Sequence, residues 1–157
     1  MSVYLITGGA RGIGPGIAAR LRQAGNAVFI ADREKAQLDG VRSVICDVSD
    51  EAQVASLLHG LEAIEGRLDG ILHHNNPDDA APHLTTARLF KAAAPLLRAG
   101  AGVAVAMGAE EVPGLTRELG RQLGPDITLR WLEDAPAADA AAAARMVALA
   151  TGLLTAA

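Results

Sequence analysis

Short apolar runs alternate with amphipathic stretches along the whole 157-residue chain. Six runs are rich in β-branched and aliphatic residues and are bounded by glycine or polar positions, which is typical of buried strands. They cover residues 3–7, 27–31, 41–46, 69–72, 102–107 and 127–131. Between them, apolar residues recur at helical spacing. The predicted helices run from Ile13 to a stop at Gly25, from Asp50 to Gly66, and over residues 85–98, 115–123 and 137–149.

The second predicted helix carries the clearest local signals. Asp50 and Gln53 have the spacing of a capping box, and Gly66 follows as a stop. Behind the cap, one apolar stripe is expected to face the core. Its members are Val54, Leu57, Leu58, Leu61 and Ile64.

Strands that alternate with helices predict βαβ units and a parallel sheet covered on both faces. Because such crossovers are right-handed, the sheet is expected to be doubly wound, with six parallel strands in the order 3-2-1-4-5-6. No internal repeat or change of composition marks a domain boundary. The α/β prediction is therefore a single Rossmann-type domain over residues 1–157.

Composition excludes several classes of function. Net charge is −4 and aromatic residues make up 3%, so no basic stripe with interleaved aromatics offers a nucleic-acid site. The single cysteine, Cys46, excludes an internal disulfide and a cysteine-cluster zinc site. No segment reaches the roughly 18 apolar residues of a membrane span, and no cationic region precedes the first apolar run. A cytoplasmic protein without membrane contact is expected.

The most informative motif is the segment 7–14, Thr-Gly-Gly-Ala-Arg-Gly-Ile-Gly, which follows a strand and opens a helix. Glycines let the backbone turn tightly and approach a pyrophosphate closely. The helix start then presents free N–H groups and partial positive charge to that anion. The residues expected to hold a dinucleotide here are Gly8, Arg11, Gly12, Ile13 and Gly14.

An acidic residue follows at the end of the second predicted strand. Asp32 lies about 24 residues after Gly8, where a carboxylate accepts hydrogen bonds from the adenosine ribose diol. The same charge would repel a 2′-phosphate, which favours NAD over NADP. Arg33 and Arg11 could each pair with such a phosphate, so NADP stays open.

These segments resemble the short-chain dehydrogenase/reductase family. Residues 7–14 match its cofactor loop, Thr-Gly-x-x-x-Gly-x-Gly, and residues 46–48, Cys-Asp-Val, resemble the end of its third strand. In that family the Asp binds the adenine amino group and the Val lies against the ring, which implies these roles for Asp47 and Val48. Residues 94–102 and 114–125 resemble its fourth helix with the following strand and the later half of its fifth helix.

The catalytic residues of that family have no counterparts in this sequence. The family uses a Tyr as general acid/base, a Lys four residues later, a Ser that orients the carbonyl and a supporting Asn. Here the only tyrosine is Tyr4, inside the first strand, and the last serine is Ser56. The two lysines, Lys35 and Lys91, do not follow a tyrosine by four residues. Residues 108–109, where the Ser is expected, read Gly-Ala.

Other family segments are shortened or replaced. Residues 73–76, His-His-Asn-Asn, stand in register with the family's Asn-Asn-Ala-Gly. His83 lies near the position of the supporting Asn. The substrate lid is expected to shrink to residues 133–136, and residues 151–153 would only begin a seventh strand. General acid/base catalysis contributes roughly 10²–10⁴-fold, so ordinary carbonyl reduction is not expected.

The densest group of titratable side chains is residues 73–79 with His83. Three interpretations remain open: a polar turn with one half-buried, hydrogen-bonded histidine, a divalent metal site, or a replacement acid/base. Adjacent strand residues point to opposite faces, so His73 and His74 do not share one ion within a strand. We expect no metal site, a buried and unreactive Cys46, a solvated His59 and a Trp131 packed at the sheet edge.

The leading hypothesis is a protein that binds NAD(H) and lacks standard dehydrogenase catalysis, acting as a nucleotide-binding or partner-binding subunit. The first alternative is an NAD(P)-dependent oxidoreductase with a non-standard site around His73, His74 and His83. The second is an architectural partner of a full-length dehydrogenase. By resemblance to the family's fourth and fifth helices, residues 85–98 and 115–123 are expected to form a homodimer interface, with a heteromer as the rival.

Overall fold

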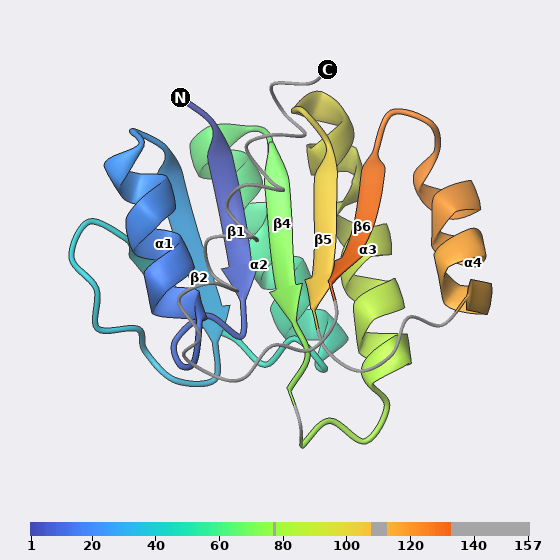
Figure 1. Ribbon diagram of the computed structural model, residues 1–157, viewed down its shortest axis with the longest axis horizontal. Helices are drawn as coiled ribbons and strands as arrows, with labels where there is room; N and C mark the ends of the chain where they lie inside the picture. Colours follow the sequence, from blue (N-terminus) through green and yellow to red (C-terminus); the bar gives the residue numbers. More distant parts are fainter. Residues whose placement is uncertain (77, 108–112, 133–157) are drawn as a thin grey trace.

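The computed structural model describes residues 1–76, 78–107 and 113–132 (Figure 1). The strands are β1 (Val3–Thr7), β2 (Ala27–Asp32), β3 (Arg42–Ile45), β4 (Gly70–His74), β5 (Val103–Met107) and β6 (Thr128–Leu132). The helices are α1 (Gly14–Gln23), α2 (Glu51–Glu65), α3 (Pro82–Ala99) and α4 (Pro113–Leu123). Within this described part, no helix combines the length and apolar character needed to span a membrane.

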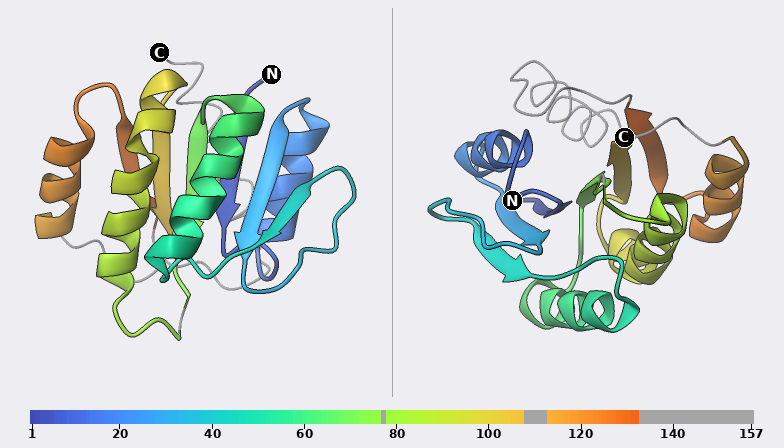
Figure 2. Two further views of the ribbon diagram at one scale, coloured as in Figure 1. Left: turned by 180° about the vertical axis from the view of Figure 1, so that it is seen from behind. Right: turned by 90° about the horizontal axis from the view of Figure 1, so that it is seen from below.

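The six strands form one parallel sheet in the order β3-β2-β1-β4-β5-β6, which confirms the predicted topology. Helix α1 covers one face of the sheet, α2 and α3 cover the other, and α4 lies beside α3 at the β6 edge (Figure 2). The chain returns to the middle of the sheet between β3 and β4. Neighbouring strands β1 and β4 therefore lead away to opposite sides, which makes their carboxyl ends the switch point of the fold.

Strand β1 shows how the sequence pattern builds a core on each face. Val3 and Leu5 belong to the cluster under α2, α3 and α4, whereas Tyr4 and Ile6 belong to the cluster under α1. All four are almost completely buried. A strand buried on both faces reads as a continuous apolar run, because neither alternate set of side chains meets water.

Several predicted boundaries need correction. Strand β3 is shorter than predicted, and half of its residues, including Ile45, are exposed because it lies at the sheet edge. Ile64 is 57% exposed and does not belong to the buried stripe of α2, whose other four members are buried. Helix α3 begins three residues earlier than predicted, at Pro82, a residue suited to a first helical turn. The predicted helix over residues 137–149 lies outside the described residues.

Helix α2 begins and ends as its sequence indicates. The Asp50 carboxylate accepts hydrogen bonds from the backbone N–H groups of Ala52 and Gln53. Gly66 closes the helix in a left-handed conformation at φ 73°. A cap of this kind stabilises a helix by roughly 1 kcal/mol.

A buried carboxylate joins three segments at the opposite end of the sheet from the carboxyl ends of the strands. Asp69 Oδ2 accepts from the N–H of Val3 at 2.7 Å, and Oδ1 accepts from the N–H of Ala101 at 3.1 Å. The Arg67 side chain donates to the same carboxylate at 3.1 Å. Each carboxylate oxygen thus has a hydrogen-bond partner, and β1, β4 and the segment before β5 are held in register.

A buried histidine joins the other end of the same strands. His73 is 1% exposed on β4, and its Nδ1 lies 2.6 Å from the hydroxyl oxygen of Thr7 on β1. Its Nε2 lies 2.9 Å from Oδ1 of Asn75 and 3.2 Å from the hydroxyl oxygen of Thr86 on α3. The ring of Phe90 packs edge-on against the imidazole. Both ring nitrogens are thus satisfied without a charged partner, and burial lowers the pKa of His73 to about 4.

This histidine gives the fold a pH dependence of known sign. Its pKa is lower in the folded than in the unfolded chain, so the unfolded state binds more protons between those values. The free energy of unfolding should therefore fall by about 2 to 3 kcal/mol from about pH 7 to about pH 4.5. Chemical denaturation at a series of pH values measures this. His73→Asn should flatten the dependence, and His59→Gln, at an exposed site on α2, should retain it; equal stability of the wild type at both pH values would contradict it.

Candidate functional site

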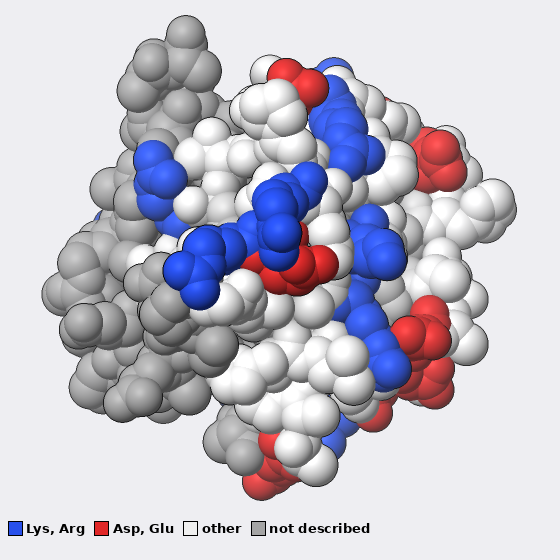
Figure 3. All heavy atoms as spheres, turned by 90° about the vertical axis from the view of Figure 1, so that its right-hand side faces the viewer, with Lys and Arg blue, Asp and Glu red and all other residues white. Residues whose placement is uncertain are grey.

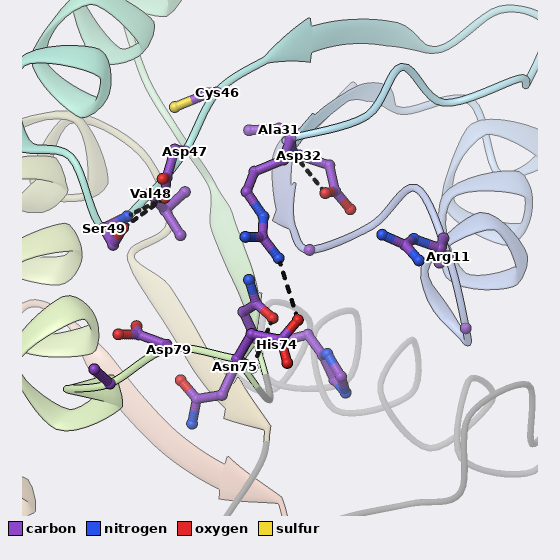
Figure 4. A pocket seen from close by; sticks show the side chains of 16 residues that line it. Arg11, Ala31, Asp32, Cys46, Asp47, Val48, Ser49, His74, Asn75 and Asp79 are labelled. Atoms are coloured by element: carbon purple, nitrogen blue, oxygen red, sulfur yellow. Dashed lines mark hydrogen bonds and ion pairs between the residues drawn. The ribbon is translucent and has the colours of Figure 1, made fainter.

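A pocket of about 440 Å³ opens at the carboxyl ends of the strands, at the switch point between β1 and β4 (Figure 4). Open parallel sheets bind ligands at this place. Four segments line it: the loop after β1, the end of β2, the residues after β3 and the segment after β4. The lining residues are Gly8, Arg11, Gly12, Ala31, Asp32, Arg33, Cys46, Asp47, Val48, Ser49, His74, Asn75, Asn76, Asp78, Asp79 and Ala80.

The loop after β1 depends on glycine at two close contacts and at one further position with positive φ. A Cβ on Gly14 would lie 2.3 Å from Cα of Gly9 and 2.4 Å from its carbonyl oxygen. Gly8 has φ 68°, and a Cβ there would lie 2.8 Å from the carbonyl oxygen of His74. Gly12 has φ 63° and lines the pocket. Glycine at these positions lets the loop fold back onto the ends of β1 and β4 and present its backbone to the pocket.

Helix α1 starts directly behind this loop. Its N-cap residue, Ile13, supplies no side-chain hydrogen bond, and Pro15 in the first turn has no N–H. The positive end of the helix is therefore not neutralised by a capping side chain or by an acid in its first turn. An anion at the loop would be attracted to it.

Asp32 is fixed at the end of β2 by two backbone donors. The N–H of Ala10, in the glycine loop, donates to Oδ2 at 3.0 Å, and the N–H of Arg33 donates to Oδ1 at 2.6 Å. Each carboxylate oxygen has more than one acceptor site, so acceptor capacity remains for a ligand hydroxyl. The hydrogen bond to Ala10 also ties the carboxylate to the loop that would bind the phosphates.

Asp47 lies at the neighbouring rim, just after β3. Its Oδ1 accepts from the N–H and the hydroxyl of Ser49, at 3.0 and 2.6 Å. These hydrogen bonds from Ser49 hold the pKa of the Asp47 carboxyl below its usual value, so it is ionised at neutral pH. Val48 is partly buried against the core and adds an apolar surface to the pocket. A flat heterocycle with a donor group would match this pair.

The segment after β4 forms the opposite rim and is rich in amides and acids. Asp78 on this rim forms a long ion pair with Arg33, at 3.9 Å. Both side chains are exposed, so the pair contributes little stability. Arg11 is paired in turn with Glu34 at 3.1 Å. Each arginine of the pocket therefore already has a carboxylate partner.

The three candidate histidines do not come together. His74 lines the pocket, His73 is buried behind it, and His83 is exposed on α3 and is not a lining residue. The expected half-buried histidine is thus fully buried. Among the described residues, no three His, Cys, Asp or Glu side chains are grouped so as to hold a metal ion.

Cys46 and Trp131 occupy unreactive positions. Cys46 is buried just after β3, beside the pocket, and burial raises the pKa of its thiol to about 11. The thiol is therefore protonated at neutral pH and is a poor nucleophile. Trp131, on edge strand β6, packs against the core and is not a lining residue, which agrees with the sequence prediction.

Seven of the nine residues expected to bind a dinucleotide line this one pocket: Gly8, Arg11, Gly12, Asp32, Arg33, Asp47 and Val48. Ile13 and Gly14 do not. Ile13 is buried in the core under α1, and Gly14 packs against Gly9, so both shape the loop from behind. The sequence interpretation missed Ser49 as the partner of Asp47 and Asn75 as a lining residue. The Asx-turn spacing from Asp47 to Ser49 would have indicated the first.

Comparison with known proteins identifies the family of this chain. A family profile described as enoyl-(acyl carrier protein) reductase matches residues 8–88, more than half of the chain. L-fucose dehydrogenase of Bos taurus is 34% identical over 98 residues, which cover 57% of this chain and 36% of that protein. Dehydrogenase/reductase SDR family member 1 of Mus musculus is 38% identical over 84 residues, 46% of this chain and 27% of that protein. The chain thus spans about a third of the length of these curated relatives.

Solved structures share the fold. A mutant short-chain dehydrogenase/reductase of Serratia marcescens superposes with a TM-score of 0.74 at 20% identity, covering 95% of this chain and 89% of that one. A short-chain dehydrogenase from Streptomyces avermitilis gives 0.63 at 20% identity, over 85% and 65%. With a matching family profile, relatives named as dehydrogenases and this shared fold, the chain belongs to the short-chain dehydrogenase/reductase family.

Proposed function

We propose that this chain is an NAD(H)-binding unit that lacks the proton-transfer apparatus of its family. The observation that carries the proposal is the pocket itself. The glycine loop that leads into α1, Asp32 and the Asp47–Val48 pair line one cavity, and these groups suit a pyrophosphate, a ribose and an adenine. A cavity of this size with a few fixed polar groups is typical of a small-molecule site.

The missing catalytic residues support the second half of the proposal. Tyr4 is the only tyrosine, and it is buried in the middle of the sheet, in the core under α1. Only five residues, 108–112, separate the end of β5 from the start of α4. Helix α4 and those five residues contain no Tyr, Lys or Ser, the residue types with which the family transfers a proton. Hydride transfer to a carbonyl would therefore lack its general acid.

The charges of the pocket favour NAD over NADP. Four aspartates and two arginines line it, and both arginines are paired with acids. Asp32 is held in place by backbone donors, with acceptor capacity left for a ribose diol. A 2′-phosphate would bring about two further negative charges beside this carboxylate, with no unpaired guanidinium in the lining to offset them. The two arginines that left NADP open in the sequence each face an acid, Glu34 for Arg11 and Asp78 for Arg33.

The proposed function predicts NADH binding without turnover. The purified protein should quench or enhance NADH fluorescence in a saturable way and release heat in isothermal titration, whereas NADH absorbance should stay constant with ketone substrates. Trp131 is not in the pocket, so nucleotide fluorescence is the better reporter. No response at millimolar NADH would leave only a structural role. Turnover that disappears in His74→Ala would instead favour the alternative of a non-standard oxidoreductase.

A matched pair of glycine variants controls this experiment. In Gly14→Ala the new methyl group would meet the Gly9 backbone, so the loop must shift and NADH affinity should fall at least about tenfold, about 1.4 kcal/mol. In Gly120→Ala, on α4, no atom lies within 4 Å of the added Cβ. This variant should keep the affinity and gain up to about 1 kcal/mol of stability. Circular dichroism confirms that both variants fold.

A second prediction concerns the choice of cofactor. Asp32→Asn keeps an oxygen for the N–H of Ala10 but removes the charge. NADH affinity should fall and NADPH affinity should rise, which shifts their ratio by roughly tenfold, or about 1.4 kcal/mol. Titration with each nucleotide measures the ratio. Asp39→Asn removes the same charge at an exposed site outside the pocket and should leave the ratio unchanged. An unchanged ratio in Asp32→Asn would show that Asp32 does not select the cofactor.

A third prediction concerns assembly. We propose a homodimer through α3 and α4, and Lys and Arg side chains gather on the face where α4 lies (Figure 3). The exposed cations of these helices are Arg88, Lys91, Arg98, Arg117 and Arg121. Two copies would bring like charges together, so salt should strengthen the dimer by screening them. Light scattering at low and high salt measures this; a monomer at micromolar concentration under both conditions would favour a heteromer with an acidic partner.

A further inference from the structure

The amide of Asn75 is tied to the interior of the protein by one end. Its Oδ1 lies 2.9 Å from Nε2 of His73 and 3.1 Å from the hydroxyl oxygen of Thr86. The residue is half-buried and lines the pocket beside His74, at the rim formed by the segment after β4 (Figure 4). One end of the amide therefore faces a buried network, and the other end faces the cavity.

The oxygen of the Asn75 amide faces the buried network, and the nitrogen faces the cavity. A carbonyl oxygen only accepts hydrogen bonds, so Nε2 of His73 must carry the proton that it donates to Asn75. In the neutral ring Nδ1 is then bare and accepts from the hydroxyl of Thr7, 2.6 Å away. Neither bond needs a charged group, which suits a ring with 1% exposure. The amide nitrogen of Asn75, with its two donors, is left on the pocket side.

Nothing in the described protein takes up these two donors. The hydrogen bonds of the Asn75 side chain run through Oδ1 alone. The nitrogen is also not enclosed, since the one buried side-chain polar atom without a partner in the described residues belongs to Trp131. Asn75 follows His74, whose carbonyl oxygen packs against Gly8. The free donors therefore lie next to the start of the glycine loop.

We propose that Asn75 is a ligand-binding residue that donates to the ribose–diphosphate portion of the nucleotide, and that His73 is the positioning residue that fixes its donor orientation. This inference rests on the proposed nucleotide-binding function and adds a side-chain donor to a loop that otherwise offers backbone N–H groups. An acceptor-rich ribose–diphosphate is the ligand part that matches two free N–H donors beside the glycine loop. The opposite amide orientation would place an oxygen toward the phosphates, and it would require the Nδ1–H tautomer of His73.

The first test measures NADH affinity by fluorescence titration. Asn75→Ala should weaken binding roughly fivefold, the effect of one lost hydrogen bond. Asn75→Asp, which replaces two donors by a negative charge beside the diphosphate, should weaken it more, at least about tenfold. Gln23→Ala removes an exposed amide at the end of α1, outside the pocket, and should bind NADH as the wild type does.

The second test reads the positioning role directly by ¹⁵N NMR of the imidazole groups. His73 should be the neutral Nε2–H tautomer, and its Nε2 signal should move when NADH binds to the wild type but not when it binds to Asn75→Ala. A merely structural histidine would not report on the ligand through Asn75. A neutral Nδ1–H tautomer would reverse the amide and overturn the assignment.

The outcomes separate this inference from the proposed function. If the wild type binds NADH and Asn75→Ala binds it equally well, the assignment of Asn75 is overturned and the proposed function stands. If the wild type binds no NADH at millimolar concentration, the proposed function fails and the assignment of Asn75 falls with it.

Discussion

The contact between the glycine loop and the ends of β1 and β4 is the constraint on which the site depends. Gly14 lies against Gly9, and Gly8 lies against the carbonyl oxygen of His74, at separations that leave no room for a Cβ. A side chain at either position would lift the loop off the sheet. The loop would then no longer offer the N–H of Ala10 to Asp32. The close approach thus links the sheet, the helix and the acidic residue in one rigid unit.

Two buried polar groups secure the strands that carry this loop. Asp69 ties the beginnings of β1 and β4 together through backbone donors, and His73 ties their ends together through Thr7. The two buried groups differ in how their polar atoms are satisfied. Asp69 accepts hydrogen bonds from Arg67 and two backbone N–H groups, whereas His73 is neutral and contacts oxygen atoms. The neutral state of His73 matters for the site. A neutral imidazole has one donor and one acceptor nitrogen, so it favours one arrangement of its partners Thr7 and Asn75.

The sequence was sufficient for the features that depend on local pattern. The strands follow from the periodicity of apolar residues, and the cap at Asp50 follows from local capping chemistry. The order of the strands follows from the handedness of the crossovers, which constrains the whole topology. Whether a given side chain is buried or exposed was harder to predict from the sequence. Ile64 continues the apolar stripe in sequence, yet it lies exposed on the helix end that passes beyond the sheet core.

The positions of the site residues could be predicted from the sequence, whereas the pairings between their side chains could not. Asp32 and Asp47 could be placed because they end strands whose order is fixed, so their carboxylates had to meet at one edge. The ion pairs of Arg11 and Arg33 join side chains across a loop or a pocket, and the hydrogen bond from Thr7 to His73 spans 66 positions in sequence. Pairings of this kind depend on the three-dimensional separation of side chains, which no spacing rule supplies.

The division of the site along the sequence explains how nucleotide binding could persist without the family's chemistry. Every lining residue lies between Gly8 and Ala80, within the part of the chain that the family profile matches. The loop, Asp32, Asp47 and the His73–Asn75 pair are held by β1 to β4 and the start of α3, and none of them contacts β5, α4 or β6 through a side-chain hydrogen bond among the described residues. Under the proposed function, the family's acid/base groups would be absent from the segment between β5 and α4, whereas the described lining residues of the pocket lie before β5. The described residues that line the pocket are thus separate along the chain from the segment that carries proton transfer in the family.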